Sequence, residues 1–145
     1  MPTSEHRTQR RIEFHETDMA GIVHFSWFNR YMEEAEHDFY RSIGFDLPLQ
    51  SFEIGWGLPR VHAECDYHNP ARFEDLLDLR LVVEELRERV VTYRIEFSRL
   101  DGEHRTPIAT GRLVVCCVTR NPEGTELKAT AFPRGFRERV RAVVE

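Results

Sequence analysis

Cysteine is scarce in this sequence, and no two cysteines have the spacing of a redox or zinc motif. The three cysteines are Cys65, Cys116 and Cys117. Neighbouring residues of a strand point to opposite faces of a sheet, so Cys116 and Cys117 are not expected to pair with each other. The odd number and the lack of any C-x-x-C pattern favour a reducing compartment. We expect at least one of the adjacent cysteines to be an inert buried thiol.

Long apolar runs are also missing. None approaches the ~20 residues that a helix needs to cross a bilayer. The N-terminal segment, MPTSEHRTQRR, lacks the apolar region of a signal peptide. These absences predict a soluble, cytoplasmic protein with no membrane partner.

Lysine is nearly absent, because Lys128 is the only lysine among 20 basic residues. The 25 acidic residues give a net charge of −5, which argues against a nucleic-acid-binding protein, whose surface is typically basic. The arginines could still form a local phosphate site, since a guanidinium holds phosphate through two parallel hydrogen bonds. No linker or repeat divides the 145 residues, of which 41% are hydrophobic, so we expect a single domain over residues 1–145.

Hydrophobic periodicity predicts a strand followed by a long helix. Ile12 and Phe14 alternate with polar residues, which predicts a strand over residues 8–15. Ser26 is the predicted N-cap of a helix over residues 27–43, and Gly44 is the residue after its C-terminal cap. Its acidic residues, Glu36 among them, lie mostly off an apolar stripe. That stripe consists of Phe28, Met32, Ala35, Phe39 and Ile43.

Four strands and a short helix are predicted after this helix. Strict alternation predicts a strand over residues 60–68, and similar patterns predict strands around residues 77–83 and 91–97. Asp101-Gly102 indicates a hairpin turn, and residues 106–119 are apolar on both faces, which is typical of a central strand. Residues 134–144 predict a short amphipathic helix through Phe136, Val140 and Val143 or Val144. Short turns make the strands largely antiparallel, so the fold class is α+β.

This order of elements resembles the hotdog fold, a five-stranded, largely antiparallel sheet wrapped around one long central helix. The segment RIEFHETDMAGIVHFSWFNRYMEEAEHDFYRSIGF, residues 11–45, is similar to the opening of the 4-hydroxybenzoyl-CoA thioesterase family. There, a loop of the form D-x-x-G-x-V leads into the central helix, and here Asp18, Gly21 and Val23 stand at its fixed positions. DYHNPARFEDLLDLRL, residues 66–81, resembles the family's turn into the third strand.

The resemblance implies hydrolysis of an acyl thioester, usually of coenzyme A, with no metal and no bound cofactor. It places the catalytic carboxylate, a nucleophile or a general base, at Asp18. It places the oxyanion donor at the backbone N–H of Phe25. A helix N-terminus suits this role, because its free N–H groups and dipole favour the negative charge that develops on the thioester oxygen.

The resemblance also implies where the substrate binds. His24, Trp27 and Phe28 would border the acyl pocket. The loop of the aroyl-CoA branch reads G-I-V-aromatic, and in this chain His24 stands at the position of the aromatic residue. Arg87 and Arg89, in the turn between the third and fourth strands, would contact the phosphates of coenzyme A. The acyl carrier could also be an acyl carrier protein. Hotdog domains usually join their sheets across a dimer interface, so a homodimer or homotetramer is expected.

Other interpretations of the D-x-x-G-x-V loop, residues 18–23 (the acidic loop), and of its neighbours stay open. Asp18 is also a common turn residue. Glu16 could be a solvated carboxylate or could orient Asp18, and His15 and His24 could simply pack or face solvent.

A metal site on the strand at residues 60–68 is disfavoured. Side chains two residues apart on a strand are about 7 Å apart, too far for several to reach one ion. A solvated or interface face is therefore favoured for His62, Glu64, Asp66 and His68.

Two other functions would fit the same fold. One is a non-catalytic hotdog module that binds an acyl-CoA or an acyl carrier. The other is a hotdog hydratase or dehydratase that uses His24 with an acid.

Overall fold

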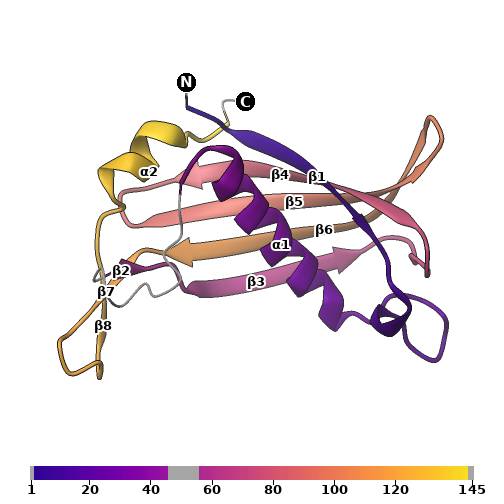
Figure 1. The fold of residues 1–145 in the computed structure, drawn as a ribbon, viewed down its shortest axis with the longest axis horizontal. Coiled ribbons are helices and arrows are strands. Elements are labelled where there is room, and N and C mark those ends of the chain that lie inside the picture. Colours follow the sequence, from indigo (N-terminus) through magenta and orange to yellow (C-terminus); the bar gives the residue numbers. More distant parts are fainter. Residues whose placement is uncertain (1, 46–55, 144–145) are drawn as a thin grey trace.

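A long helix lies across one face of an antiparallel sheet (Figure 1). The computed structural model describes residues 2–45 and 56–143. Five strands form the main sheet in the order β1-β4-β5-β6-β3, and all its pairings are antiparallel. The helix is α1 (Ser26–Ser42), and the strands are β1 (Glu5–Arg11), β3 (Arg60–Tyr67), β4 (Leu76–Leu86), β5 (Val90–Asp101) and β6 (His104–Cys116). The predicted α+β architecture is confirmed.

The core lies between α1 and the inner face of the sheet. On β4 and β5, alternate side chains point inward and are buried, as their sequence period predicts. Phe28 packs edge-on against Phe97 with ring centroids 5.3 Å apart, and Phe39 packs against Tyr93 at 6.0 Å. The predicted hairpin joins β5 to β6, with Gly102 at a φ of +65° that suits glycine.

Of the two predicted ends of α1, the C-terminal cap is confirmed and the N-cap residue is wrong. At the C-terminus, Gly44 has a φ of +72°, and the N–H of Phe45 donates to the Tyr40 carbonyl at 2.9 Å. This is a Schellman cap, so the role predicted for Gly44 is confirmed. At the N-terminus the N-cap is Phe25, not Ser26 as predicted. Ser26 is already helical, and its hydroxyl lies 2.8 Å from Nδ1 of His24.

The buried face of α1 is wider than the apolar stripe. Glu36, which was expected off the stripe, is 1% exposed. Its carboxylate accepts hydrogen bonds from the Tyr40 hydroxyl at 2.7 Å and from Arg60, at the start of β3. Burial raises the pKa of Glu36, although Arg60 and Tyr40 act in the opposite direction. The prediction failed because Arg60, which makes the burial possible, is distant in sequence.

The first strand runs earlier than predicted. β1 covers residues 5–11, not 8–15, and pairs with β4 from Glu5↔Val82 to Arg11↔Leu76. The chain then turns into a short 3-10 helix, η1 (Phe14–Glu16), so Ile12 is buried while Phe14 is 73% exposed. The prediction that these two residues share a face is wrong. The sequence EHRTQRR has no hydrophobic alternation, so its pattern gives no sign of this edge strand.

The C-terminal part departs from the prediction in two places. The strand predicted over residues 106–119 is interrupted after Cys116, and its end forms a small second sheet in the order β2-β7-β8. The helix predicted over residues 134–144 ends at residue 139, because Val140 is extended and forms a parallel bridge with Thr3. The additional elements are β2 (Trp56–Gly57), β7 (Val118–Arg120), β8 (Leu127–Ala129) and α2 (Arg134–Arg139).

Residues 46–55, between the predicted helix and the strand predicted over residues 60–68, and Val144 lie outside the described residues. Within the described residues, neither helix combines the length and the apolar character needed to cross a membrane.

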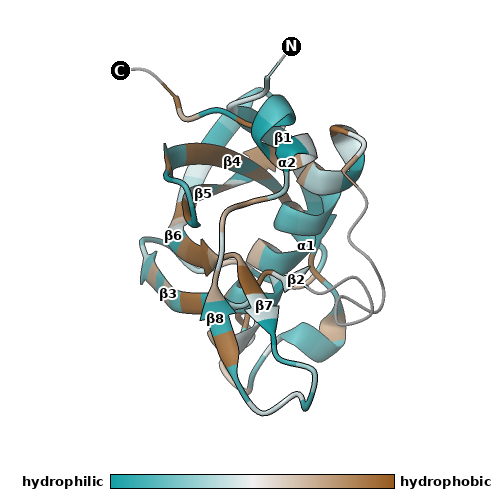
Figure 2. Cartoon of the chain, turned by 90° about the vertical axis from the view of Figure 1, so that its left-hand side faces the viewer, coloured by the Kyte–Doolittle hydropathy of each residue, from teal (hydrophilic) through white to brown (hydrophobic). Residues whose placement is uncertain are grey.

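Strand β3 forms one edge of the main sheet, and its hydrophobic side chains are uncovered. Figure 2 shows the alternation of hydrophobic and hydrophilic residues along β3. The strand itself is confirmed, but Val61 and Tyr67 are 61% and 53% exposed. An edge strand with exposed apolar residues is suited to pair with another chain.

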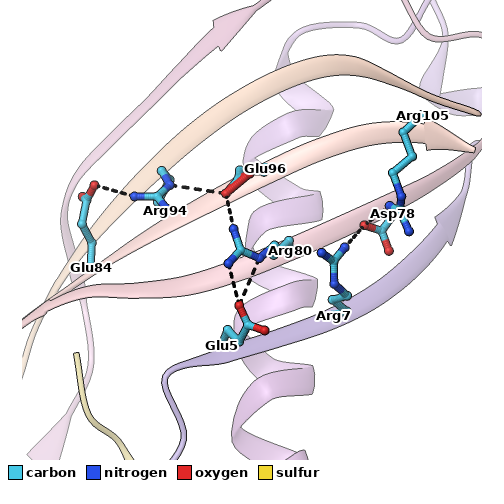
Figure 3. Close-up of polar contacts among 8 residues, drawn as sticks. All are labelled: Glu5, Arg7, Asp78, Arg80, Glu84, Arg94, Glu96 and Arg105. Carbon is cyan, nitrogen blue, oxygen red and sulfur yellow. Dashed lines mark hydrogen bonds and ion pairs between the residues drawn. The ribbon is translucent and has the colours of Figure 1, made fainter. Parts of the chain in front are cut away.

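The outer face of the sheet, away from α1, carries a network of charges (Figure 3). Arg80 donates to Glu5 at 2.7 Å and to Glu96 at 2.8 Å, and Arg94 donates to Glu84 at 3.1 Å. A separate cluster is centred on Asp78, which accepts from Arg7 at 2.6 Å and from Arg105 at 2.7 Å. The sheet therefore has one apolar face and one face whose charges largely compensate one another.

We predict that this network makes stability depend on pH. The hydrogen bond from Arg112, together with that from Arg94, lowers the pKa of Glu84. The stabilisation is therefore present above the ordinary glutamate pKa and is lost as the pH falls through the lowered pKa. At pH 7, Glu84→Gln should decrease the free energy of unfolding by about 1 kcal/mol.

Urea unfolding followed by circular dichroism between pH 7 and pH 3 measures this effect. The difference between wild type and Glu84→Gln should shrink toward acid pH. Glu103→Gln, in the exposed β5–β6 turn, is the matched control and should change little. A difference that stays constant over this range would contradict the assignment.

Candidate active site

Asp18 lies in a short loop whose two ends are held together. Thr17 and Val23 form an antiparallel bridge, and the N–H of Asp18 donates to the Ile22 carbonyl at 2.9 Å. The Asp18 carboxylate accepts the N–H of Ala20 at 2.8 Å, and Gly21 turns the chain at a φ of +79°. The local bonds of the loop therefore define the place of Asp18, which is exposed.

The backbone at the start of α1 has one open donor. The N–H of His24 donates to the Glu16 carbonyl at 2.9 Å, and that of Trp27 donates to the His24 carbonyl at 3.0 Å. The N–H of Ser26 points to Nδ1 of His24 at 3.3 Å. The N–H of Phe25 has no acceptor among residues 2–45 and 56–143. A free N–H at a helix N-terminus is suited to bind negative charge.

Asp18, Phe25 and Phe28 lie along one cavity of about 520 Å³. Its other apolar walls come from the acidic loop and from the turn after β3: Ile22, Val23, Pro70 and Ala71. The structure therefore brings together the predicted carboxylate, the predicted oxyanion donor and one of the three predicted pocket residues. A mostly apolar cavity with a few polar groups is typical of a small-molecule site.

The polar side of this cavity was not predicted from sequence. Tyr67, His68 and Asn69 line it at the end of β3. His68 Nε2 lies 3.1 Å from the Thr110 hydroxyl, and the Asn69 amide donates to the Pro107 carbonyl at 2.7 Å. The sequence signal that could have indicated these three residues is their position in the DYHNPARFEDLLDLRL segment. That segment leads from one predicted strand toward the next.

The structure does not bring His24 and Trp27 to this cavity. His24 is held by Ser26 and lies against Phe25, with ring centroids 4.7 Å apart. Trp27 packs against His15, and the guanidinium of Arg30 lies 5.3 Å from its ring centre. In a single chain, both residues lie beside the cavity and do not line it.

Glu16 is buried, not solvated as one interpretation had it. It is 0% exposed, and its carboxylate accepts three hydrogen bonds. These come from Arg10 of β1, from the Tyr31 hydroxyl of α1 at 2.8 Å, and from the N–H of Glu13 at 2.8 Å. Burial and the hydrogen bond to Glu16 raise the pKa of Tyr31, so its hydroxyl remains a donor at neutral pH.

Arg87 and Arg89 lie at the far end of the sheet from Asp18. They occupy the β4–β5 turn, whereas the acidic loop lies beside the start of β4 (Figure 1). The length of β4 separates the two ends by about 30 Å. Both side chains are exposed, and Arg87 bonds to Glu85. One chain alone therefore does not bring these arginines to its own cavity.

Neither a metal centre nor a reactive cysteine is indicated by the described residues. Of the four candidate ligands on and just after β3, His62 and Glu64 bond to each other at 3.1 Å, but no three come together. Glu13, His15 and Glu16 do lie close together, but the carboxylate of Glu16 is already bound by Arg10 and Tyr31.

The cysteines are free thiols, and burial raises the pKa of Cys65 and of Cys117 to about 11. Thiols with such a pKa are poor nucleophiles at neutral pH. Cys117 is therefore a buried and inert thiol, as expected for at least one of the adjacent pair.

Comparison with known proteins identifies the family. The family model described as the Thioesterase-like superfamily matches residues 12–140. A 1,4-dihydroxy-2-naphthoyl-CoA hydrolase of Synechococcus elongatus is 34% identical over 119 residues, which cover 79% of this chain and 82% of that protein. A putative esterase of Aquifex aeolicus is 38% identical over 85 residues, 59% of this chain and 66% of that protein.

Solved structures agree with the fold. The 4-hydroxybenzoyl-CoA thioesterase from Pseudomonas sp. strain CBS-3 superposes with a TM-score of 0.83 at 24% identity, covering 94% of this chain and 99% of that one. A hypothetical protein from Aquifex aeolicus superposes with a TM-score of 0.78 at 30% identity, covering 92% and 97%. Sequence and structure thus lead to the same conclusion: the chain has the hotdog fold and belongs to the Thioesterase-like superfamily.

Proposed function

We propose that this chain hydrolyses aromatic acyl-CoA thioesters, with Asp18 as the catalytic carboxylate and the N–H of Phe25 as the oxyanion donor. Family membership makes the chain a thioesterase; the acyl group and the roles of the residues are the proposal. One observation carries it. The open N–H at the start of α1 belongs to a residue that lines the same cavity as Asp18.

The chemistry requires two groups acting on opposite sides of the thioester carbonyl. As a nucleophile, Asp18 would displace the thiolate and form a mixed anhydride, which water then hydrolyses. As a general base, it would take a proton from an attacking water. Either route consumes one water and yields a carboxylic acid and the thiol of coenzyme A. The Phe25 N–H would bind the carbonyl oxygen as its negative charge develops.

The cavity supports an aromatic acyl group. Phe28, Pro70 and Ala71 offer apolar surfaces, while Tyr67, His68 and Asn69 offer polar groups that could meet a ring hydroxyl. Relatives and structural neighbours are named for hydroxylated aroyl-CoA substrates, 1,4-dihydroxy-2-naphthoyl-CoA and 4-hydroxybenzoyl-CoA.

Phosphate binding by Arg87 and Arg89 requires a second copy of the chain. Antiparallel pairing of two β3 edges would place the β4–β5 turn of one copy near the acidic loop of the other. This is because β3 begins at the end of the sheet that holds the turn and ends at the cavity. The exposed Val61 and Tyr67 on β3 favour such pairing. We therefore propose a homodimer whose two sites each combine residues of both copies.

Substitution of Asp18 by asparagine tests its role as the catalytic carboxylate. Asp18→Asn keeps an oxygen that can accept the Ala20 N–H, so the loop and the melting temperature should be preserved. Turnover should fall by roughly 10²–10⁴-fold, because the amide neither attacks nor takes a proton. Free-thiol release from 4-hydroxybenzoyl-CoA measures it, with Glu103→Gln in the exposed β5–β6 turn as the control. A fully active Asp18→Asn enzyme would exclude this carboxylate, and binding without turnover by wild type would favour the non-catalytic module.

Substitution of Phe25 by proline tests the oxyanion donor. Phe25 has a φ of −55°, which proline accepts, so Phe25→Pro removes the N–H with little change in backbone. Its kcat should fall by about 10²–10³-fold. Phe25→Ala retains the N–H and should keep most of kcat. Equal loss in both variants, with circular dichroism showing α1 intact, would mean that the side chain and not the N–H matters.

Mixed dimers test whether the two copies share each site. Asp18→Asn and the double variant Arg87→Ala/Arg89→Ala should each be weakly active alone. In a mixed dimer one of the two sites has Asp18 and both arginines, so random mixing should restore about a quarter of the wild-type sites. Thiol release at low substrate concentration measures this recovery after subunits are exchanged. No recovery in verified mixed dimers would show that the arginines serve the cavity of their own chain or none.

A further inference from the structure

Glu16 is a buried carboxylate that touches neither the cavity nor solvent, yet it lies two residues before Asp18. Burying a charge is unfavourable unless it is paired and hydrogen-bonded. Arg10 supplies the pairing charge, and the Tyr31 hydroxyl and the Glu13 N–H supply further hydrogen bonds. Arg10 also lies over the Tyr31 ring, with its guanidinium carbon 5.2 Å from the ring centre. The carboxylate thus ties β1, η1 and α1 to one point.

The backbone of Glu16 continues this connection into the active loop. Its carbonyl accepts the N–H of His24, and Thr17, the next residue, forms the bridge to Val23. These contacts, between Glu16 and His24 and between Thr17 and Val23, form the neck of the loop. Asp18 follows the first side of the neck, and α1 begins after the second side. His24 donates to Glu16, and the next N–H along the chain, that of Phe25, has no acceptor among the described residues.

We propose that Glu16 is a positioning residue for catalysis, whose carboxylate fixes the loop neck on β1 and α1 and thereby sets Asp18 against the Phe25 N–H. This inference rests on the proposed function. Misplacing a reacting group by about 1 Å can reduce a rate 10²-fold, so a fixed neck matters to turnover even though Glu16 does not touch the substrate.

A second buried carboxylate, Glu36 in the C-terminal half of α1, provides a matched control. Glu36 is 1% exposed and is also bound by an arginine, Arg60, and by a tyrosine hydroxyl, that of Tyr40. Glu36 contacts neither the acidic loop nor the residues of the cavity. If buried carboxylates acted only through stability, changes at Glu16 and at Glu36 would affect activity alike.

The experiment compares four variants of the full chain: Glu16→Gln, Glu36→Gln, Tyr31→Phe and Tyr40→Phe. Each glutamine keeps the side-chain volume but removes the charge that faces an arginine, so both glutamine variants should melt at lower temperature. For Glu16→Gln, kcat for 4-hydroxybenzoyl-CoA should fall about 10–100-fold with KM changed by less than about three-fold. Glu36→Gln should keep kcat within about two-fold of wild type. Tyr31→Phe removes only one donor to Glu16 and should lower kcat several-fold, whereas Tyr40→Phe should not.

Amide hydrogen exchange gives a readout that does not depend on turnover. The N–H of His24 should exchange faster in Glu16→Gln and Tyr31→Phe than in wild type, and should be unchanged in the Glu36 and Tyr40 variants. If Glu16→Gln does not fold, Tyr31→Phe and Tyr40→Phe carry the comparison.

The outcomes separate this inference from the proposed function. Equal losses of kcat at Glu16 and Glu36, or unchanged kcat and unchanged His24 exchange in both Glu16→Gln and Tyr31→Phe, would overturn the positioning role. If wild type releases no thiol from aroyl-CoA esters, the proposed function fails. The exchange of His24 then still decides whether Glu16 holds the neck: faster exchange supports it and unchanged exchange overturns it.

Discussion

The carboxylate of Glu16 is the constraint on which the local structure around the candidate site depends. A charged group with no exposure must satisfy its oxygens within the protein, and here the donors come from β1, from the N-cap residue of η1 and from α1. These bonds hold η1 and the neck of the acidic loop against β1 and the helix. The N–H of His24 is used by the Glu16 carbonyl, and the next N–H along the chain, that of Phe25, has no acceptor among the described residues.

The rest of the fold presents this loop in a particular setting. Only one face of the main sheet is apolar, and α1 covers it, whereas the outer face is neutralised by its own ion pairs. Two of the exposed apolar side chains, Val61 and Tyr67, lie on the β3 edge, and Tyr67 also lines the cavity with Asp18. A second chain on that edge would cover Val61 and bring the distant arginine turn to the substrate. Dimerisation and substrate binding would then depend on the same strand.

The sequence was most informative where hydrophobic periodicity and a local motif coincided. The buried alternation of β4 and β5, the stripe of α1 and the Gly44 cap were all predictable, because each depends on residues close in sequence. The acidic loop was recognisable by its D-x-x-G-x-V pattern, which placed Asp18 and Phe25 as candidates before the cavity was known.

The failures have a common physical cause. Glu16 and Glu36 are ordinary acidic residues in sequence, and their burial depends on Tyr31 and Arg60, which are 15 and 24 residues away along the chain. The polar edge strand β1 is specified by its pairing with β4, not by its own pattern. Ser26 has the chemistry of an N-cap, but the bond from His24 to Glu16 positions the backbone one residue earlier. Contacts between distant residues thus determine the details that matter most for the candidate site.

In the proposed site, the loop neck sets Asp18 and the Phe25 N–H on either side of one thioester carbonyl. A crystal structure of the Asp18→Asn variant with intact 4-hydroxybenzoyl-CoA would show this arrangement. The carbonyl oxygen should lie about 2.7–3.1 Å from the Phe25 nitrogen, with the residue 18 side chain facing the carbonyl carbon and the ring against Phe28. A thioester bound with its carbonyl oxygen away from Phe25, or in a different cavity, would contradict it.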